Sequence, residues 1–100
     1  MATTSKALFR GAASTGSTTL YTVPSATTAI VTNIAVTNTA SSSATFTIKL
    51  DGVDVISGPA IDAKTTVIFD MKQPLSVGDL IEGSASATTV NFHIAGIEVS

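Results

Sequence analysis

His93, the only histidine, is the first residue to test for chemistry, because an imidazole can act as a general base or bind a metal ion. A metal site needs further His or Cys ligands, and the sequence has no second His and no Cys. A hydrolytic triad needs a recognisable nucleophile, and no Ser lies in a GxSxG motif. Strand alternation points the ring away from the face that Phe92 and Ile94 share. We therefore expect His93 to be a structural residue, with neither a catalytic nor a metal site around it.

The acidic residues include two close pairs that could suit acid–base catalysis or calcium binding. Asp51 and Asp54 lack the additional oxygen ligands of a calcium loop, and a turn explains them more simply. Asp79 and Glu82 are separated so that an extended strand points them to opposite faces. The seven Gly form neither a GxxxxGK[ST] nor a GxGxxG phosphate-binding motif. The sequence thus predicts no cofactor and no enzymatic activity.

The charge of the chain is low and dispersed, which limits the classes of partner. Charged residues make up 12% of the sequence, the net charge is −2, and the five basic residues form no run. Direct nucleic-acid binding by a basic patch is therefore not expected. The sequence has no apolar run near the roughly 20 residues of a transmembrane helix, and no signal-peptide pattern. We expect synthesis in the cytoplasm and no membrane attachment.

Ser and Thr take the place of the missing charges, with 12 Ser and 17 Thr beside 44% hydrophobic residues. Thr favours strands, and the apolar residues recur at strand period, so the pattern predicts a folded β domain rather than a disordered chain. A surface with so few charges is typical of a subunit that partners cover. We expect a homo-oligomer, a trimer, formed through one face of residues 29–38 or through the small residues of 83–86.

The clearest structural signal is a hairpin in residues 44–56, ATFTIKLDGVDVI. Apolar residues alternate with Thr and Lys from Ala44 to Leu50, which is the period of a strand with one buried face. Asp51 and Gly52 tolerate positive φ, as both central positions of a type I′ turn require. The register that such a two-residue loop fixes pairs Leu50 with Val53, Lys49 with Asp54 and Ile48 with Val55.

Eight strand candidates cover the chain, and no gap between them could hold a helical crossover. They are residues 6–12, 18–23, 29–38, 44–50, 53–56, 65–71, 80–86 and 89–99. In the third candidate, Ile30, Ile34 and Val36 share one face. Both faces of this candidate carry small or apolar residues, so it should lie centrally in a sheet. A β-bulge at Gly96 in the last strand would keep Ile97 with the apolar set. The expected fold is all-β, an antiparallel eight-stranded β-sandwich of the jelly-roll type, with an immunoglobulin-like sandwich as the alternative.

We divide the chain into an N-terminal arm with a peripheral strand, residues 1–11, and a single β-sandwich domain, residues 12–100. Residues 1–5 have no periodicity, so the arm should be mobile until it docks on a partner. Its candidate contact residues are two cations and two large apolar side chains, Lys6, Leu8, Phe9 and Arg10. Phe46, Phe69 and Phe92 lie on apolar strand faces and should be core. Phe9 lies outside that pattern and could anchor in a partner's pocket while Arg10 orients it on acidic neighbours.

The string LYTVPSATTAIVTNIAVTNTASSSATFTIKLDG, residues 20–52, resembles a pattern found in small virion proteins of tailed bacteriophages. The later PLSVGDLIEGSAS and the terminal IAGIEVS resemble the closing strands of the same proteins. The resemblance implies a non-enzymatic structural role in the virion, without catalytic residues. The implied protein is a capsid decoration (cement) protein that contacts the major capsid protein, or else a component of the tail, neck or fibre.

A small carbohydrate-binding or adhesion module is the alternative from another functional class. Sugar-binding grooves usually present exposed Trp or Tyr as stacking platforms. The chain has no Trp and one Tyr. The virion structural role is therefore favoured, and the expected location is the virion.

Overall fold

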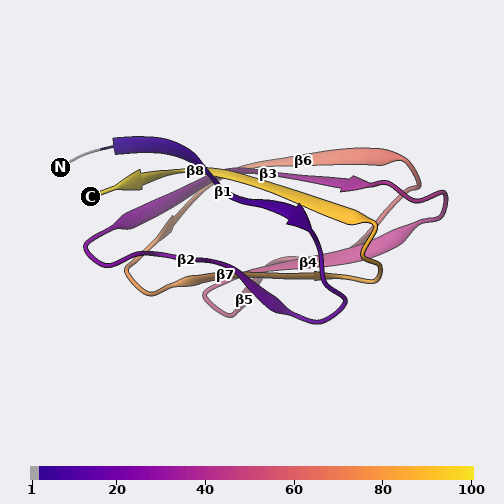
Figure 1. Ribbon diagram of the computed structural model, residues 1–100, viewed down its shortest axis with the longest axis horizontal. Coiled ribbons are helices and arrows are strands. Elements are labelled where there is room, and N and C mark those ends of the chain that lie inside the picture. The colour runs from indigo at the N-terminus through magenta and orange to yellow at the C-terminus, as the bar shows by residue number, and fades with distance from the viewer. Residues whose placement is uncertain (1–2) are drawn as a thin grey trace.

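The computed structural model describes residues 3–100 and contains two four-stranded antiparallel sheets (Figure 1). The strands are β1 (Thr3–Ala12), β2 (Thr18–Thr22), β3 (Thr28–Asn38), β4 (Ala44–Leu50), β5 (Val53–Ile61), β6 (Thr65–Leu75), β7 (Leu80–Ala85) and β8 (Val90–Val99). Sheet A has the order β1-β8-β3-β6, and sheet B has the order β2-β7-β4-β5. The all-β antiparallel sandwich predicted from the sequence is confirmed.

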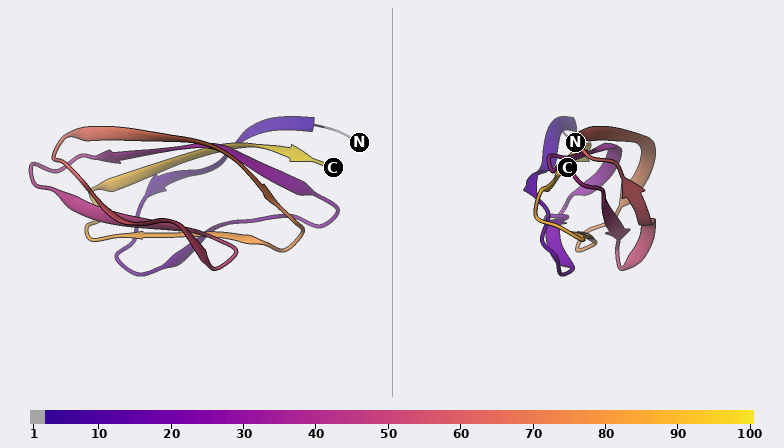
Figure 2. Two further views of the ribbon diagram at one scale, coloured as in Figure 1. Left: turned by 180° about the vertical axis from the view of Figure 1, so that it is seen from behind. Right: turned by 90° about the vertical axis from the view of Figure 1, so that its right-hand side faces the viewer.

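Each strand pairs with its counterpart counted from the other end of the chain. β1 pairs with β8, β2 with β7, β3 with β6 and β4 with β5. The pairings of β3 with β8 and of β4 with β7 join these ribbons into the two sheets. One long antiparallel ribbon rolled up in this way is a jelly roll rather than the immunoglobulin-like alternative. The end-on view shows the two layers, with β1 and β2 along one side and β5 and β6 along the other (Figure 2).

The β4–β5 hairpin has the predicted turn and most of the predicted register. Asp51 and Gly52 both have positive φ, 53° and 79°, as a type I′ turn requires. Leu50 pairs with Val53 and Lys49 with Asp54, but Ile48 pairs with Ile56 and not with Val55. Val55 is the extra residue of a bulge, which the alternation of the sequence did not reveal. The strand also continues to Ile61, because an edge strand tolerates a positive φ at Gly58 and the missing N–H of Pro59.

The three predicted core Phe residues meet between the sheets. Phe46 and Phe92 are fully buried, and Phe69 packs partly buried against the core. The Phe46 ring meets the Phe69 and Phe92 rings edge to face, with centroids 6.0 and 6.3 Å apart. This geometry places the positive edge of one ring against the negative face of another.

Two of the small residues of 83–86 face the interior, while Ser84 and Ser86 lie on the outer face of the strand end. Gly83 and Ala85 are buried in β7, an inner strand of sheet B. A Cβ on Gly83 would come within 2.9 Å of Leu20 and 3.1 Å of Phe92. Glycine is needed there because large side chains of the same chain occupy the space.

Gly96 is also required, but for a reason that differs from the predicted bulge. β8 keeps its alternation throughout, and the extra residues lie in its two neighbours, Leu8 in β1 and Thr32 in β3. A Cβ on Gly96 would lie 2.4 Å from the carbonyl oxygen of Ile30 and 2.7 Å from Leu8. The neighbouring strands therefore close in on Gly96, and Ile97 lies on the face opposite to the buried residues of β8.

The bulge at Thr32 also changes which residues of β3 share a face. β3 lies between β8 and β6, so its predicted central position is confirmed. Val31 is buried before the bulge, and Ile34 and Val36 are buried after it. The predicted grouping of Ile30 with these two residues is wrong because one inserted residue reverses the alternation.

Asn38 ends β3 as a fully buried polar residue. Its amide nitrogen donates hydrogen bonds to the carbonyl oxygens of Ser42, Ile61 and Asp62, at 2.8, 3.3 and 3.4 Å. Its side-chain oxygen accepts from the amide of Ala40 at 3.1 Å. One side chain thus satisfies backbone groups of two connections, as burial of polar groups demands.

β1 begins at Thr3, earlier than the peripheral strand predicted from Lys6, and is an edge strand of sheet A. Its pairing runs from Thr3 with Val99 to Ala12 with Asn91. Backbone pairing orders this segment although its first side chains bury little area. The segment from Thr3 onward is therefore paired with β8 in this structure. The prediction for Met1 and Ala2 lies outside the described residues.

Candidate partner-binding surface

The Leu8 bulge sends the two cations of β1 to opposite faces of sheet A. Lys6 and Arg10 are spaced so that a regular strand would point both to one face. The inserted residue reverses the alternation, so Lys6 pairs with Gly96 on the inner side and Arg10 pairs with His93 on the outer side. The four residues predicted to contact a partner therefore do not form one surface.

Lys6 takes part in a network of polar interactions within the chain. Its Nζ lies 3.5 Å from a carboxylate oxygen of Glu98. The hydroxyl of Tyr21 donates a hydrogen bond to the other oxygen of the same carboxylate. Burial raises the pKa of the Tyr21 hydroxyl well above its ordinary value, and the hydrogen bond to the Glu98 carboxylate raises that pKa further. The network joins β1, β8 and β2.

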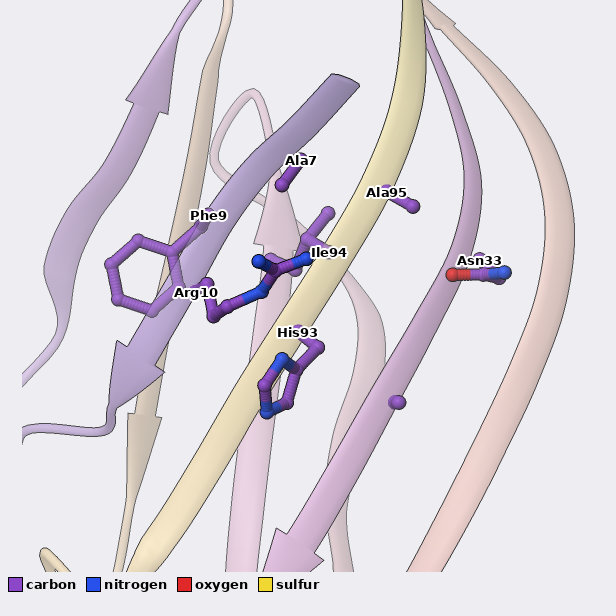
Figure 3. Close-up of a pocket in the computed structure, with 8 residues that line it drawn as sticks. Ala7, Phe9, Arg10, Asn33, His93, Ile94 and Ala95 are labelled. Atoms are coloured by element: carbon purple, nitrogen blue, oxygen red, sulfur yellow. The ribbon is translucent and has the colours of Figure 1, made fainter. Parts of the chain in front are cut away.

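The two apolar residues of the predicted set also differ from one another. Leu8 is 7% exposed and belongs to the core, where it packs over Gly96. Phe9 is partly buried against the core, and its ring lies on the side of β1 away from β8 (Figure 3). Phe9 and Arg10 are therefore the two predicted residues that remain available near the free edge of the sheet.

Arg10 borders a hollow of about 210 Å³ on the outer face of sheet A. Arg10 from β1, His93 from β8 and Asn33 from β3 project from this face, with Ala95 between them (Figure 3). Antiparallel partners share a face, so Ala35 lies beside His93 and Ala95 beside Asn33. Short alanine side chains leave the recess that the three polar side chains surround.

The polar groups around this hollow have no partner within residues 3–100. The ion pair found in that part of the chain joins Lys6 to Glu98, and no side-chain hydrogen bond there involves Arg10, His93 or Asn33. Arg10 and His93 are exposed, and Asn33 is half-buried. The hollow therefore combines the positive charge of Arg10 with further hydrogen-bonding groups that are free to bind.

The rest of the outer face lies toward β6 and is different in character. Ile68 pairs with Ala35 and is 66% exposed, and Asp70 pairs with Asn33. A second, wider hollow of about 550 Å³ is lined by Thr32, Asp70, Met71 and Lys72. Asp70 and Lys72 give this side both signs of charge, whereas the described residues that line the Arg10 hollow include no Asp or Glu.

Residues 3–100 contain no group of three His, Asp or Glu side chains placed to hold a metal ion. Over the same residues, no helix long and apolar enough to cross a membrane is found.

No protein-family model matches the sequence, and a search of curated proteins gave no match. The structure is similar to a chain of the T13 IBDV viral particle, with a TM-score of 0.54 and 12% sequence identity. The match covers 97% of this chain and 30% of that chain, so this chain spans less than a third of the protein it resembles. A second similarity, to dimeric latent PorU from Porphyromonas gingivalis, has a TM-score of 0.39 at 14% identity and covers 97% of this chain and 9% of that chain.

Sequence reasoning missed the surroundings of Arg10. It placed His93 on the outer face correctly, but it did not connect His93 with Asn33 or Arg10. The pairing of β1 with β8 and of β8 with β3 joins segments far apart in sequence. The available signal was the set of polar residues that alternate with buried residues along the longest strands. This signal identifies a site only once the strand order is known.

Proposed function

We propose that this chain is a non-enzymatic structural protein of a bacteriophage virion that decorates the head and cements it by binding the major capsid protein. The observation that carries this proposal is the jelly roll, which this chain shares over 97% of its length with a chain of an assembled viral particle. The resemblance of residues 20–52 to virion proteins of tailed bacteriophages supports the same role. The virion is then its place of action.

The surface that we propose for attachment is the β1 side of sheet A, with Phe9 and Arg10 as the contact residues. Lys6 and Leu8 serve the chain's own structure, so they support this surface rather than form it. Aromatic residues and Arg are enriched where binding energy concentrates in interfaces. Deletion of residues 2–10 is a poor test because it would remove most of an edge strand and uncover β8.

We also propose a homo-trimer, with the subunits in contact on the β6 side of sheet A. Ile68 is 66% exposed there and continues the outer face of β3, one of the two surfaces expected from the sequence. Closed symmetry would cover this side chain in every subunit. Light scattering should give a mass about three times 10.1 kDa, and Ile68→Asp should reduce it to that of a monomer.

The direct test uses purified protein and heads assembled from the major capsid protein. We expect the protein to sediment with the heads at saturable occupancy and cryo-electron microscopy to place its density on the outer head surface. Heads that remain bare at saturating protein, or density found on tails alone, would contradict the decoration role. The melting temperature of the heads should rise when the protein is bound, because binding to the assembled state stabilises it.

A further inference from the structure

The hollow beside Arg10 has the composition of a site for a small anion. Among the described residues that line this hollow, Arg10 is the one Arg or Lys, and Asn33 and His93 bring groups that can donate hydrogen bonds. These side chains come from three adjacent strands of one sheet, so the backbone pairing fixes their spacing. A site held by paired strands is better defined than one held by loops.

We infer that this hollow binds a carboxylate group from an acidic side chain of a partner protein. A guanidinium presents parallel N–H donors that match the two oxygens of a carboxylate, and such charge-assisted pairs are among the stronger hydrogen bonds. The Arg10 guanidinium matches the single negative charge of a carboxylate, whereas a phosphate dianion carries a second negative charge. The apolar floor of Ala7, Ala35 and Ala95 keeps water from part of the ligand, which strengthens the attraction.

The hollow suits the end of a side chain better than an extended ligand. Its volume is about 210 Å³, and its lining residues come from β1, β3 and β8. On the β6 side of β3, Asp70 pairs with Asn33, and its carboxylate repels a second negative charge there. A carboxylate is therefore directed toward Arg10 and away from β6.

The inference rests on the proposed function for the source of the carboxylate, which is an acidic residue on the capsid subunit. An acidic sugar carries the same group and is the other source. The observations favour a protein, because a sugar site usually has an exposed aromatic platform. The floor of this recess is formed by alanine residues. The one Phe, Tyr or Trp among the described lining residues, Phe9, is partly buried and lies to the far side of β1 (Figure 3).

The first experiment measures carboxylate binding without any particle. ¹⁵N-labelled protein is titrated with sodium acetate at constant ionic strength, and the signals of the Arg10 and Asn33 side chains are followed by NMR. We expect saturable shifts, with affinity reduced about tenfold in Arg10→Gln and less in Arg10→Lys, which keeps the charge but loses the planar fork. Lys72→Gln removes an exposed lysine of the same sheet and should leave the affinity within about twofold.

Four outcomes of this titration would overturn the inference. Shifts that are absent in the wild type, or equal in Arg10→Gln, would show that the hollow does not bind carboxylates. Tighter binding of inorganic phosphate than of acetate would assign it to another anion. If N-acetylneuraminic acid binds more than about tenfold tighter than acetate, the sugar contributes contacts of its own and the protein partner is the wrong source. Equal melting temperatures of the variants show that the folded protein is compared throughout.

The second experiment separates this inference from the proposed function. Wild type, Arg10→Gln and Lys72→Gln are compared for sedimentation with heads. We expect weaker attachment, by about tenfold, for Arg10→Gln alone. If all three attach equally, the decoration role stands and the carboxylate contact is wrong. If none attaches although acetate binds at Arg10, the site stands as an anion site while the decoration role and its capsid carboxylate both fail.

Discussion

The two ends of β1 carry one cation each, and the chain uses them in opposite ways. Lys6 is paired with Glu98, which also accepts the hydrogen bond of Tyr21. Arg10 has no such partner within residues 3–100 and borders an open hollow with His93. One inserted residue, Leu8, separates these environments by reversing the alternation between them. The difference shows that a single bulge decides whether a charge supports the fold or is available to a partner.

A side chain that fills the space at Gly96, where the Leu8 bulge meets β8, should destabilise the protein most. Gly96→Ala places a Cβ 2.4 Å from a backbone oxygen of β3 and 2.7 Å from Leu8. The backbone cannot yield as a flexible side chain can, so we expect a loss of about 3 kcal/mol in the free energy of unfolding, measured in urea. Gly16→Ala is the control, since its Cβ would meet nothing within 4 Å. Equal losses in both variants would contradict a role for close packing at Gly96.

Leu8→Ala tests the bulge from the other side and should have the next largest effect. Leu8 is 7% exposed, and its truncation removes buried area and leaves a cavity over Gly96. We expect a loss of about 2 kcal/mol in the free energy of unfolding, at the low end of the usual range because β1 is an edge strand.

The same variant should loosen the hollow, because the bulge orients Arg10 toward it. We expect faster amide hydrogen exchange in β1, and weaker acetate shifts at Arg10, than in the wild type. Thr4→Ala, at an exposed position of the same strand, should change neither. A loss of stability with unchanged acetate binding would mean that the position of Arg10 is fixed without Leu8.

Most of the fold followed from the sequence because its signals are local. The type I′ turn depends on Asp51 and Gly52 alone, and the three core Phe residues follow from alternation within single strands. The bulges at Val55, Leu8 and Thr32 could not be predicted from the sequence, because the choice between a regular and a bulged pair depends on the neighbouring strands.

The candidate site was less predictable than the fold, for the same physical reason. Arg10 was identified as a contact residue, but its neighbours come from strands that only the tertiary pairing brings together. The burial of Asn38 in the interior was equally hard to predict from the sequence. A polar residue at the end of an apolar strand suggests exposure, yet its amide satisfies backbone groups from two connections and is fully buried.

The smallest expected effect concerns the Lys6 end of β1 and is a dependence of stability on pH. Because the pKa of Tyr21 is raised in the folded protein, folding favours the protonated hydroxyl. In the unfolded chain the hydroxyl ionises near its ordinary value of 10.0, so this contribution is complete below that pH and is lost as the pH rises further. Tyr21→Phe removes the titrating group. It should be less stable by about 1 kcal/mol at pH 7, where its hydrogen bond is lost.

Urea denaturation from pH 8 to 11 should therefore show a shallower alkaline decline for Tyr21→Phe than for the wild type. Lysines also titrate in this range, and Lys6→Gln is the control because it removes the ion pair with Glu98 while Tyr21 remains. That variant should keep the tyrosine contribution to the decline. Parallel curves for the wild type and Tyr21→Phe would mean that the hydroxyl ionises equally in both states. Glu98 would then orient Lys6 without support from Tyr21, and the contrast between the two ends of β1 would rest on the ion pair alone.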